Sequence, residues 1–367
     1  MNFDFSDDQK LLADQVQRYL DDHCNNTVAR AVLDGEQAYA QDVWAGLAEM
    51  GLLGTAIGEE YGGTGAGYLE LCLVAQQIGA HIAPVPFGGT VYQVAEALLA
   101  SDDEDSKTRW LPKIASGEVK GALAVVENLG ADTPRTPACE VIDGKLRGSK
   151  LAVTDGALAD VYVVLAAAQG QPGLYLVDAQ TAVEATTVES VDLTKNVANV
   201  AFDDAPAHLL SSDGLAALAA LEDRAAVLYA FEQLGGAQSA LDMAVAYAKE
   251  RFAFGRAIGS FQAIKHMLAD MYVSLKLAES NCYYAAWALA NDAADLPLAA
   301  ATARVAATQA FQLCARDNIQ VHGGMGFTWE FDCHMYYRRA NLLAMELGGL
   351  SKWEQRLVAS LPLQASA

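Results

Sequence analysis

The segment from Arg251 to Asp270, RFAFGRAIGSFQAIKHMLAD, places an arginine, glycines and a glutamine around a break between two predicted helices. Gly255 and Gly259 interrupt the helical period of the preceding residues, so Arg251 is expected at a helix end. Ser260 is a suitable N-cap for the second helix. Backbone N–H groups at a helix start and a guanidinium that donates to two oxygens suit a diphosphate. The pattern predicts a phosphate clamp, although local sequence alone favours a helical hairpin with solvated arginines.

One acid stands alone in the helix that precedes this segment. Glu232 is the only charged residue between Arg224 and Asp242. Small residues follow it at helical spacings, namely Gly235, Gly236 and Ser239. Burial of a carboxylate raises its pKa toward the range that a general base needs. We therefore expect Glu232 to face a groove and act as a base; the alternative is a structural glutamate exposed to solvent or paired with an arginine.

The elements that must position these residues follow from periodicity. Up to about residue 113, stretches such as LLADQVQRYL and LELCLVAQQIG carry apolar residues at helical spacing. Between Gly121 and Phe202, β-branched runs such as VYVVLA and VANVAF predict strands. Long Ala/Leu-rich helices return from about Asp213. The order predicts an α+β protein, mostly α, with a helical domain at 1–115, a β domain at 116–210 and a four-helix bundle at 211–367.

Composition excludes several classes of function. The 367 residues are 53% hydrophobic, which supports a large core. A net charge of −22 opposes binding to nucleic acid or to an anionic membrane. The acidic start and the lack of a long uncharged apolar run predict a cytoplasmic protein with no membrane partner. The six cysteines lack metal-ligand spacing, so we expect buried thiols and no metal site.

Four segments in order carry a family resemblance. They are FSDDQKLL from Phe5, GLLGTAIGEEYGGTG from Gly51, the Arg251 segment, and QVHGGMGFT from Gln320. Together they span nearly the whole chain and resemble the acyl-CoA dehydrogenases. The resemblance implies a helical N-terminal domain, a middle β-barrel or sandwich domain and a C-terminal four-helix bundle.

The resemblance also implies FAD, which members of this family bind between subunits. Arg251, Phe254 and Gln262 match positions that hold the diphosphate and adenosine of a neighbouring subunit's FAD. Gln320, Gly323 and Gly324 match the loop on the adenine side. Glycines there permit close approach of the backbone to a cofactor, while the alternative is an ordinary helix cap.

The end that would hold the flavin ring departs from the family pattern. The usual Thr-Glu-Pro-Gly segment reads Val126-Glu127-Asn128-Leu129, so the threonine hydroxyl is absent. The usual Trp-Ile-Thr-Asn segment reads AVTD from Ala152, which keeps Thr154 and removes the indole. Thr154 is a candidate partner for a ring nitrogen or a plain strand residue.

The usual catalytic base is also missing. Many members carry it as the glutamate of a Tyr-Glu-Gly-Thr segment, but Leu347 stands there in this chain. Glu346 lies one residue away, about 100° around a helix end, so we expect it to be a surface or structural residue. Some family members supply the base from the helix before the clamp, which supports Glu232.

These departures resemble subunits of heteromeric (α2β2) bacterial acyl-CoA dehydrogenases that act on bulky substrates, including steroid side-chain thioesters. The resemblance implies α,β-dehydrogenation of an acyl-CoA, a homologous partner subunit in a heterotetramer, and electron-transfer flavoprotein as acceptor. A non-catalytic partner subunit and a flavin oxidase remain as alternatives. Apolar side chains of ordinary type line thioester cavities, so no motif identifies the acyl group.

Overall fold

The computed structural model describes residues 5–130 and 133–361. Contacts group the chain into two compact units, one of Met1–Thr27, Cys72–Ala83 and Ala226–Ala367, the other of Val28–Leu71 and Pro84–Ala225. This grouping differs from the three stretches 1–115, 116–210 and 211–367, whose status as domains stays a prediction. The outer ends of the first and third stretches, 1–4 and 362–367, lie outside the described residues.

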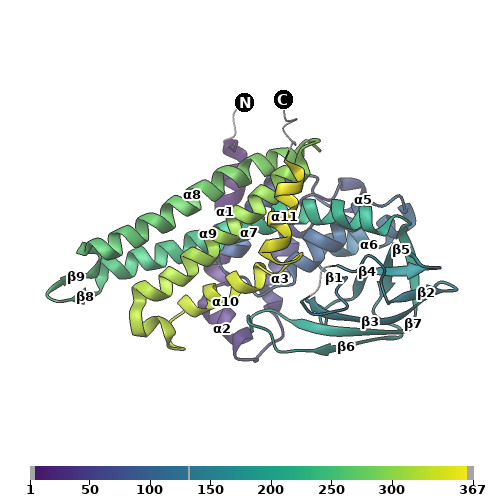
Figure 1. The fold of residues 1–367 in the computed structure, drawn as a ribbon, viewed down its shortest axis with the longest axis horizontal. Helices are drawn as coiled ribbons and strands as arrows, with labels where there is room; N and C mark the ends of the chain where they lie inside the picture. Colours follow the sequence, from purple (N-terminus) through teal and green to yellow (C-terminus); the bar gives the residue numbers. More distant parts are fainter. Residues whose placement is uncertain (1–4, 131–132, 362–367) are drawn as a thin grey trace. The chain divides into compact units, whose positions relative to one another are not determined.

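The first unit consists mainly of helices (Figure 1). Its elements are α1 (Asp7–His23), the end of α4 (Tyr68–Ala80), most of α7 (Gly214–Glu250), β8 (Phe252–Ala253), β9 (Arg256–Ala257), η4 (Ile258–Ser260), α8 (Gln262–Ala290), α9 (Leu296–His322), η5 (Gly323–Phe327), α10 (Cys333–Leu343) and α11 (Leu350–Ser360). Helix α9 contacts α8, α10 and α11, and Phe231 of α7 stacks on Tyr283 of α8 with ring centroids 6.2 Å apart. The long helices predicted from Asp213 onward thus form a bundle.

Glycines allow helices α4 and α7 to cross at close range. A Cβ added at Gly79 would lie 1.8 Å from the carbonyl oxygen of Glu232, and one at Gly235 would lie 1.8 Å from that of Gln76. Each glycine of one helix therefore touches the backbone of the other. This crossing fixes the depth at which the Glu232 turn of α7 lies in the unit.

The second unit combines short helices with a sheet. Its elements are α2 (Asn26–Leu33), α3 (Gln41–Glu49), η1 (Leu52–Gly54), η2 (Glu59–Tyr61), the π-helix η3 (Gly88–Ala95), α5 (Glu96–Ala100), α6 (Glu104–Ala115), and the strands β1 (Gly121–Ala124), β2 (Glu140–Ile142), β3 (Lys145–Thr154), β4 (Val161–Ala168), β5 (Gln171–Asp178), β6 (Val183–Thr187) and β7 (Val197–Ser211). Helices α4 and α7 begin in this unit and continue into the first.

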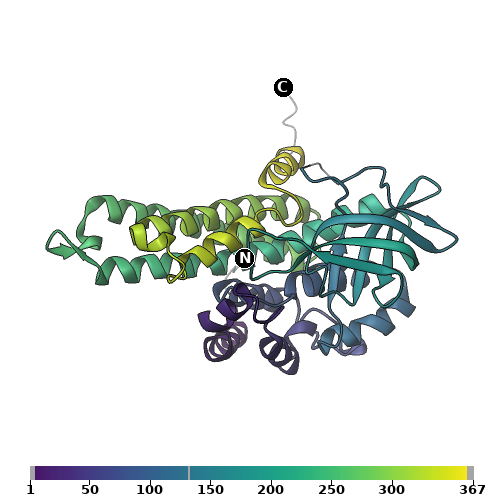
Figure 2. The ribbon, with the colours of Figure 1, turned by 90° about the horizontal axis from the view of Figure 1, so that it is seen from below.

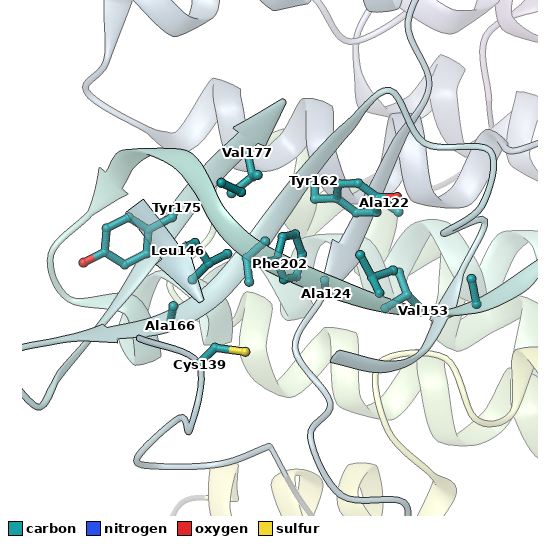
Figure 3. Close-up of a cluster of buried hydrophobic side chains, with 14 residues drawn as sticks. Ala122, Ala124, Cys139, Leu146, Val153, Tyr162, Ala166, Tyr175, Val177 and Phe202 are labelled. Atoms are coloured by element: carbon teal, nitrogen blue, oxygen red, sulfur yellow. The ribbon is translucent and has the colours of Figure 1, made fainter. Parts of the chain in front are cut away.

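The sheet closes on itself. Its strand order is β1-β4-β2-β3-β7-β5, and β5 also pairs with β4, while β6 pairs with β7. Strands β1 and β2 run parallel to β4, whereas the other pairings are antiparallel. The interior is a cluster of buried apolar side chains in which Tyr162 and Phe202 meet edge to face, with centroids 5.8 Å apart (Figure 3). Closure and this core agree with the predicted middle β-barrel.

The remaining compositional expectations have a direct structural counterpart. All six cysteines are buried free thiols, as predicted. None of the helices within residues 5–130 and 133–361 combines the length and apolar character that a membrane span requires.

Candidate functional site

The Arg251 segment forms a small β-hairpin between α7 and α8. Strands β8 and β9 pair Phe252 with Ala257, and Gly255 turns the chain with a φ of +79°. The hairpin is the extreme tip of the helical unit in both views (Figures 1 and 2). The Arg251 amide still donates to the carbonyl of Tyr247 at 2.8 Å, so Arg251 lies at the end of α7 as predicted.

The predicted helix cap at Ser260 is wrong. Helix α8 begins at Gln262, its N-cap residue is Phe261, and no side chain caps it. The Ser260 hydroxyl instead donates to the carbonyl of Ala257 at 2.7 Å, inside the 3-10 turn η4. A serine hydroxyl that closes a local turn is not available to cap the N–H groups of the following helix.

The clamp residues of the hairpin are open to solvent. Arg251, Phe254 and Gln262 are exposed, and the Phe254 side chain is 95% exposed with a φ of +53°. The Arg256 guanidinium lies 4.1 Å from the centroid of the Phe261 ring, a cation–π contact that uses the face of the guanidinium. Arg251 and Arg256 are both exposed, so both are accessible to an external phosphate.

The second glycine segment lies at the same end of the helical unit. His322, the last residue of α9, stacks on Tyr247 of α7 with ring centroids 4.0 Å apart. Burial lowers the pKa of His322, and its Nδ1 lies 2.8 Å from the carbonyl of Asn318. His322 therefore packs as a neutral structural ring and joins the ends of α7 and α9.

Gly323 and Gly324 present open backbone next to that ring. A Cβ added at either position would meet no atom within 4 Å. Gly323 has φ +61° and ψ −137°, a conformation that favours glycine, while Gln320 is exposed. Exposed donors and open glycines fit the nucleotide end of FAD, because a phosphate or adenine ring could approach the backbone without a steric clash.

Thr154 belongs to the second unit. It is the last residue of β3, is half-buried, and pairs with Val197 of β7. A register shift between Lys150 and Val153 precedes it, and Ala152 and Asp155 have φ values of +50° and +58°. The strand is irregular at this point, which is common next to binding sites. Its role toward a flavin ring stays a prediction.

Glu127, in the segment that replaces Thr-Glu-Pro-Gly, binds neighbouring protein groups. Its carboxylate accepts from the backbone N–H groups of Ala138 and Cys139 at 2.7 and 3.0 Å. The ammonium of Lys150, which is fully buried, lies 2.7 Å away. Burial alone would raise the pKa of Glu127, but the bonds from Ala138, Lys150 and Cys139 outweigh it and lower the pKa. The carboxylate therefore ties two chain segments together.

We expect Glu127→Gln to destabilise the fold at pH 7 by about 1–3 kcal/mol, because charge-assisted hydrogen bonds are lost beside a buried lysine. A lowered folded-state pKa contributes stability above the unfolded pKa and loses it as the pH falls through the folded pKa. The difference between wild type and variant should hence shrink as the pH falls below the ordinary glutamate pKa of about 4.3 and through the lower folded-state pKa. Urea unfolding across that range measures it, and a difference that is constant with pH would contradict the assigned charge state.

Glu232 is buried and lies beside an arginine. Its side chain is almost inaccessible to solvent, and its Oε1 is 3.6 Å from Nη1 of Arg339 on α10. Arg339 is itself fully buried and donates to the carbonyl of Ile82 at 3.4 Å. The contacts of Glu232 are therefore those of the second expectation, a glutamate paired with an arginine. The role of Glu232 as a base stays a prediction.

The prediction of a groove beside Glu232 is wrong at the two glycines that follow it, because other helices pack against both. Gly235 faces the backbone of α4, and a Cβ at Gly236 would lie 2.4 Å from Cζ of Phe311. Ser239 is hydrogen-bonded to the hydroxyl of Tyr336, which donates to the carbonyl of Ala80 at 3.0 Å. The small residues allow close packing of helices instead of opening a cavity.

Glu346 also differs from its expected setting. Helix α10 ends at Leu343, so Glu346 lies in a turn and the argument from helical rotation does not apply. Its side chain is buried, so of the two expected settings, surface or structural, the surface one is wrong. Leu347, at the position of the usual base, has a φ of +58°, which is uncommon for a residue other than glycine.

Sequence reasoning missed two buried cations of this region, Arg304 and Arg339. Arg304 is the only charged residue between Asp295 and Arg316, and it is buried in α9. A lone charge in an Ala-rich helix was the available signal, the same signal that identified Glu232. Arg339 had no comparable signal, because it lies in a polar stretch next to Arg338.

Two family models match the chain. Residues 6–118 match the acyl-CoA dehydrogenase N-terminal domain, and residues 213–359 match the acyl-CoA dehydrogenase C-terminal domain. Among known proteins, acyl-CoA dehydrogenase IpdE2 of Mycobacterium tuberculosis is 34% identical over 339 residues, which cover 91% of this chain and 91% of that protein.

Two solved structures share the fold at similar length. A chain of the Tcur3481-Tcur3483 steroid ACAD, solved as a single-residue variant, is 31% identical with a TM-score of 0.88, covering 96% of this chain and 97% of that one. A chain of the ChsE4-ChsE5 complex from Mycobacterium tuberculosis is 27% identical with a TM-score of 0.89, covering 99% and 100%. These likenesses confirm the predicted fold class and the resemblance seen in the sequence.

Proposed function

The chain belongs to the acyl-CoA dehydrogenase family, a family of FAD-dependent oxidoreductases, and we propose that it takes part in α,β-dehydrogenation of an acyl-CoA as one subunit of a heteromeric enzyme. FAD, when bound, would supply the hydride acceptor for the β-carbon of the thioester, and a carboxylate of the chain would remove the α-proton. The chain's own residues bind the nucleotide, orient the thioester and hold the proton.

The exposed clamp is the observation that carries this proposal. Arg251 is exposed at the base of the hairpin, and Phe254 is almost fully accessible at its turn. Gly323 and Gly324 add open backbone at the same end of the unit. An aromatic ring and a guanidinium that protrude in this way are suited to a cofactor held jointly with another subunit.

The partner and substrate are proposed from the relatives. The Tcur3481-Tcur3483 protein is a steroid ACAD, and ChsE4-ChsE5 is a complex of two named chains. By analogy, the partner of this chain is a homologous subunit in an α2β2 heterotetramer, and the substrate is a bulky thioester such as a steroid side-chain acyl-CoA. Electron-transfer flavoprotein is the proposed acceptor and the cytoplasm the proposed compartment.

Glu232 is the proposed base, located on α7 ahead of the clamp. Its burial removes the carboxylate from water, as a base that abstracts a carbon-bound proton requires. The neighbouring Arg339 guanidinium favours the ionised form, which is the form that accepts a proton.

A second candidate function is a non-catalytic subunit that contributes structure and the nucleotide clamp. The specific observation in its favour is the Glu232–Arg339 pair, since an ion pair enclosed by helices satisfies a glutamate without any substrate. Leu347 in place of the usual acid agrees with this candidate. In both candidates, Arg251 binds FAD.

Arg251→Met is expected to weaken FAD binding by about 10–100-fold, because a charge-assisted contact to phosphate contributes roughly 1.5–3 kcal/mol. The variant should be prepared together with the product of the neighbouring gene, and flavin content measured by absorbance and by titration of the apoprotein. Folding should not change, since the side chain is exposed.

Arg147→Met is the matched control, because Arg147 is an exposed arginine of β3 that pairs with Asp204. Its flavin content should equal that of wild type. Two results would count against the proposal: equal flavin binding by Arg251→Met and wild type, or a chain that gains neither flavin nor activity when co-expressed with its neighbour.

A further inference from the structure

Arg304 is a buried cation that no step proposed above uses. It projects from α9, and its side chain is 1% exposed. Its Nη1 donates to Oε1 of Gln233 on α7 at 2.6 Å. Its Nη2 donates to the carbonyl of Leu343 and, at 2.9 Å, to that of Glu346. One planar guanidinium thus joins two helices and the turn that follows α10.

Arg304 binds carbonyls at the end of α10 and in the turn that follows it. The last carbonyls of a helix lack intrahelical partners, and Arg304 supplies donors for Leu343, the last residue of α10, and for Glu346 in the turn. Lys352 donates to the carbonyl of Leu347 at 3.1 Å. Two cations thus bind three carbonyls of the segment that leads from α10 to α11.

Gln233, the residue that follows Glu232 on α7, binds Arg304 through its side chain. Its side chain is fully buried, and its Nε2 donates to Oγ1 of Thr308, one helical turn beyond Arg304 on α9, at 3.1 Å. The Oε1 of Gln233 accepts from Arg304 and also from Oγ1 of Thr308 at 3.2 Å, so both partners of the amide are on α9. A displacement of Arg304 would remove one of the two α9 side chains that hold Gln233 in the turn of α7 that carries Glu232.

The electrostatic setting keeps Arg304 charged. Burial lowers the pKa of Arg304 to about 10, opposed by the nearby Glu346, Tyr229 and Glu232. The guanidinium is therefore protonated at neutral pH, and its N–H groups remain hydrogen-bond donors. A charged group inside a helical bundle is costly unless its bonds are satisfied, which argues for a specific role of these three contacts.

We propose that Arg304 is a positioning residue, which holds the turn 344–348 in a fixed place against Gln233 and so sets that turn relative to Glu232. It touches no reacting atom and acts through the backbone carbonyls of the turn. The claim about activity rests on the proposed function, whereas the claim about the turn does not.

Hydrogen exchange of the turn amides provides the first test. The N–H groups of Ala344, Met345 and Gly348 donate to the carbonyls of Ala340, Leu342 and Met345 at 3.1, 2.9 and 3.0 Å, respectively. In Arg304→Gln, measured in the co-expressed complex, we expect these amides to exchange about tenfold faster than in wild type. Arg304→Lys should give an intermediate increase, because an ammonium keeps the charge but lacks the planar fork.

Steady-state kinetics provide the second test. Arg304→Gln should lower kcat by about 10–100-fold, because a small misplacement of site groups has that effect, while KM and flavin content stay close to wild type. Arg304→Lys should recover part of kcat. If Arg304→Gln does not fold, Arg304→Lys carries both measurements.

The outcomes separate this inference from the proposed function. Unchanged exchange at Ala344, Met345 and Gly348 overturns the inference. Faster exchange throughout α9 with an unchanged kcat per bound flavin also overturns it, because that pattern describes a purely structural role. A wild-type complex without dehydrogenase activity refutes the proposed function, and the exchange of the turn amides then decides the inference alone.

Discussion

Replacing Glu232 with glutamine is expected to lower kcat for acyl-CoA dehydrogenation by about 10²–10⁴-fold, the usual contribution of a positioned general base. Glutamine keeps the size of the side chain and can still accept a hydrogen bond, but it cannot take up the α-proton. Its effect should fall on kcat, with little change in KM for the thioester. The measurement is turnover with an artificial electron acceptor, normalised to bound flavin.

Glu222→Gln is the matched control for this prediction. Glu222 is another buried acid of α7, so the substitution alters the same chemistry on the same helix. We expect its kcat to stay within about threefold of wild type, as for a group that does not transfer the proton. Unchanged turnover in Glu232→Gln would refute the base assignment and favour the non-catalytic subunit, whereas a large loss in Glu222→Gln would place the base elsewhere on α7.

Arg339→Met is expected to lower the free energy of unfolding by about 3–5 kcal/mol, because it removes a buried cation that lies beside the buried carboxylate of Glu232. The two charges lie 3.6 Å apart, and neither is accessible to water that could replace the lost partner. Urea unfolding followed by circular dichroism measures the effect. The double variant Glu232→Met, Arg339→Met should recover part of the loss, since it buries no unpaired charge.

An exposed ion pair provides the comparison. Arg147 and Asp204 form a salt bridge on the sheet with both side chains accessible to solvent. Arg147→Met should cost less than about 1 kcal/mol, as is usual for a surface pair. Equal costs at positions 147 and 339 would mean that Arg339 does not compensate the charge of Glu232.

Both predictions concern Glu232, which can have two duties, one structural and one catalytic. The Glu232–Arg339 pair can stabilise the bundle and also keep the carboxylate ionised. Loss of stability in Arg339→Met tests the first duty, and loss of turnover in Glu232→Gln tests the second. A subunit in which only the first duty is found would be the structural partner of a catalytic companion.

Periodicity and motifs predicted the order of elements and the helix end at Arg251. Helical spacing before Gly121, β-branched runs to Phe202 and Ala/Leu-rich helices after Asp213 all appear as helices and strands of the expected type. Arg251 and Phe254 are found at an exposed hairpin. These features depend on local backbone preference and on side-chain period, both of which can be seen in a short window of sequence.

A short window of sequence does not show which groups surround the acidic residues. The sequence by itself determined that Glu232 is a lone charge on an apolar helix and that Leu347 replaces the usual acid. Only the tertiary structure decided that Arg339 faces Glu232, that Gly79 and Gly235 close the expected groove, and that Arg304 holds the turn after α10. The physical reason is that burial and pairing of charges arise between helices far apart in the chain, while capping and periodicity arise within one helix.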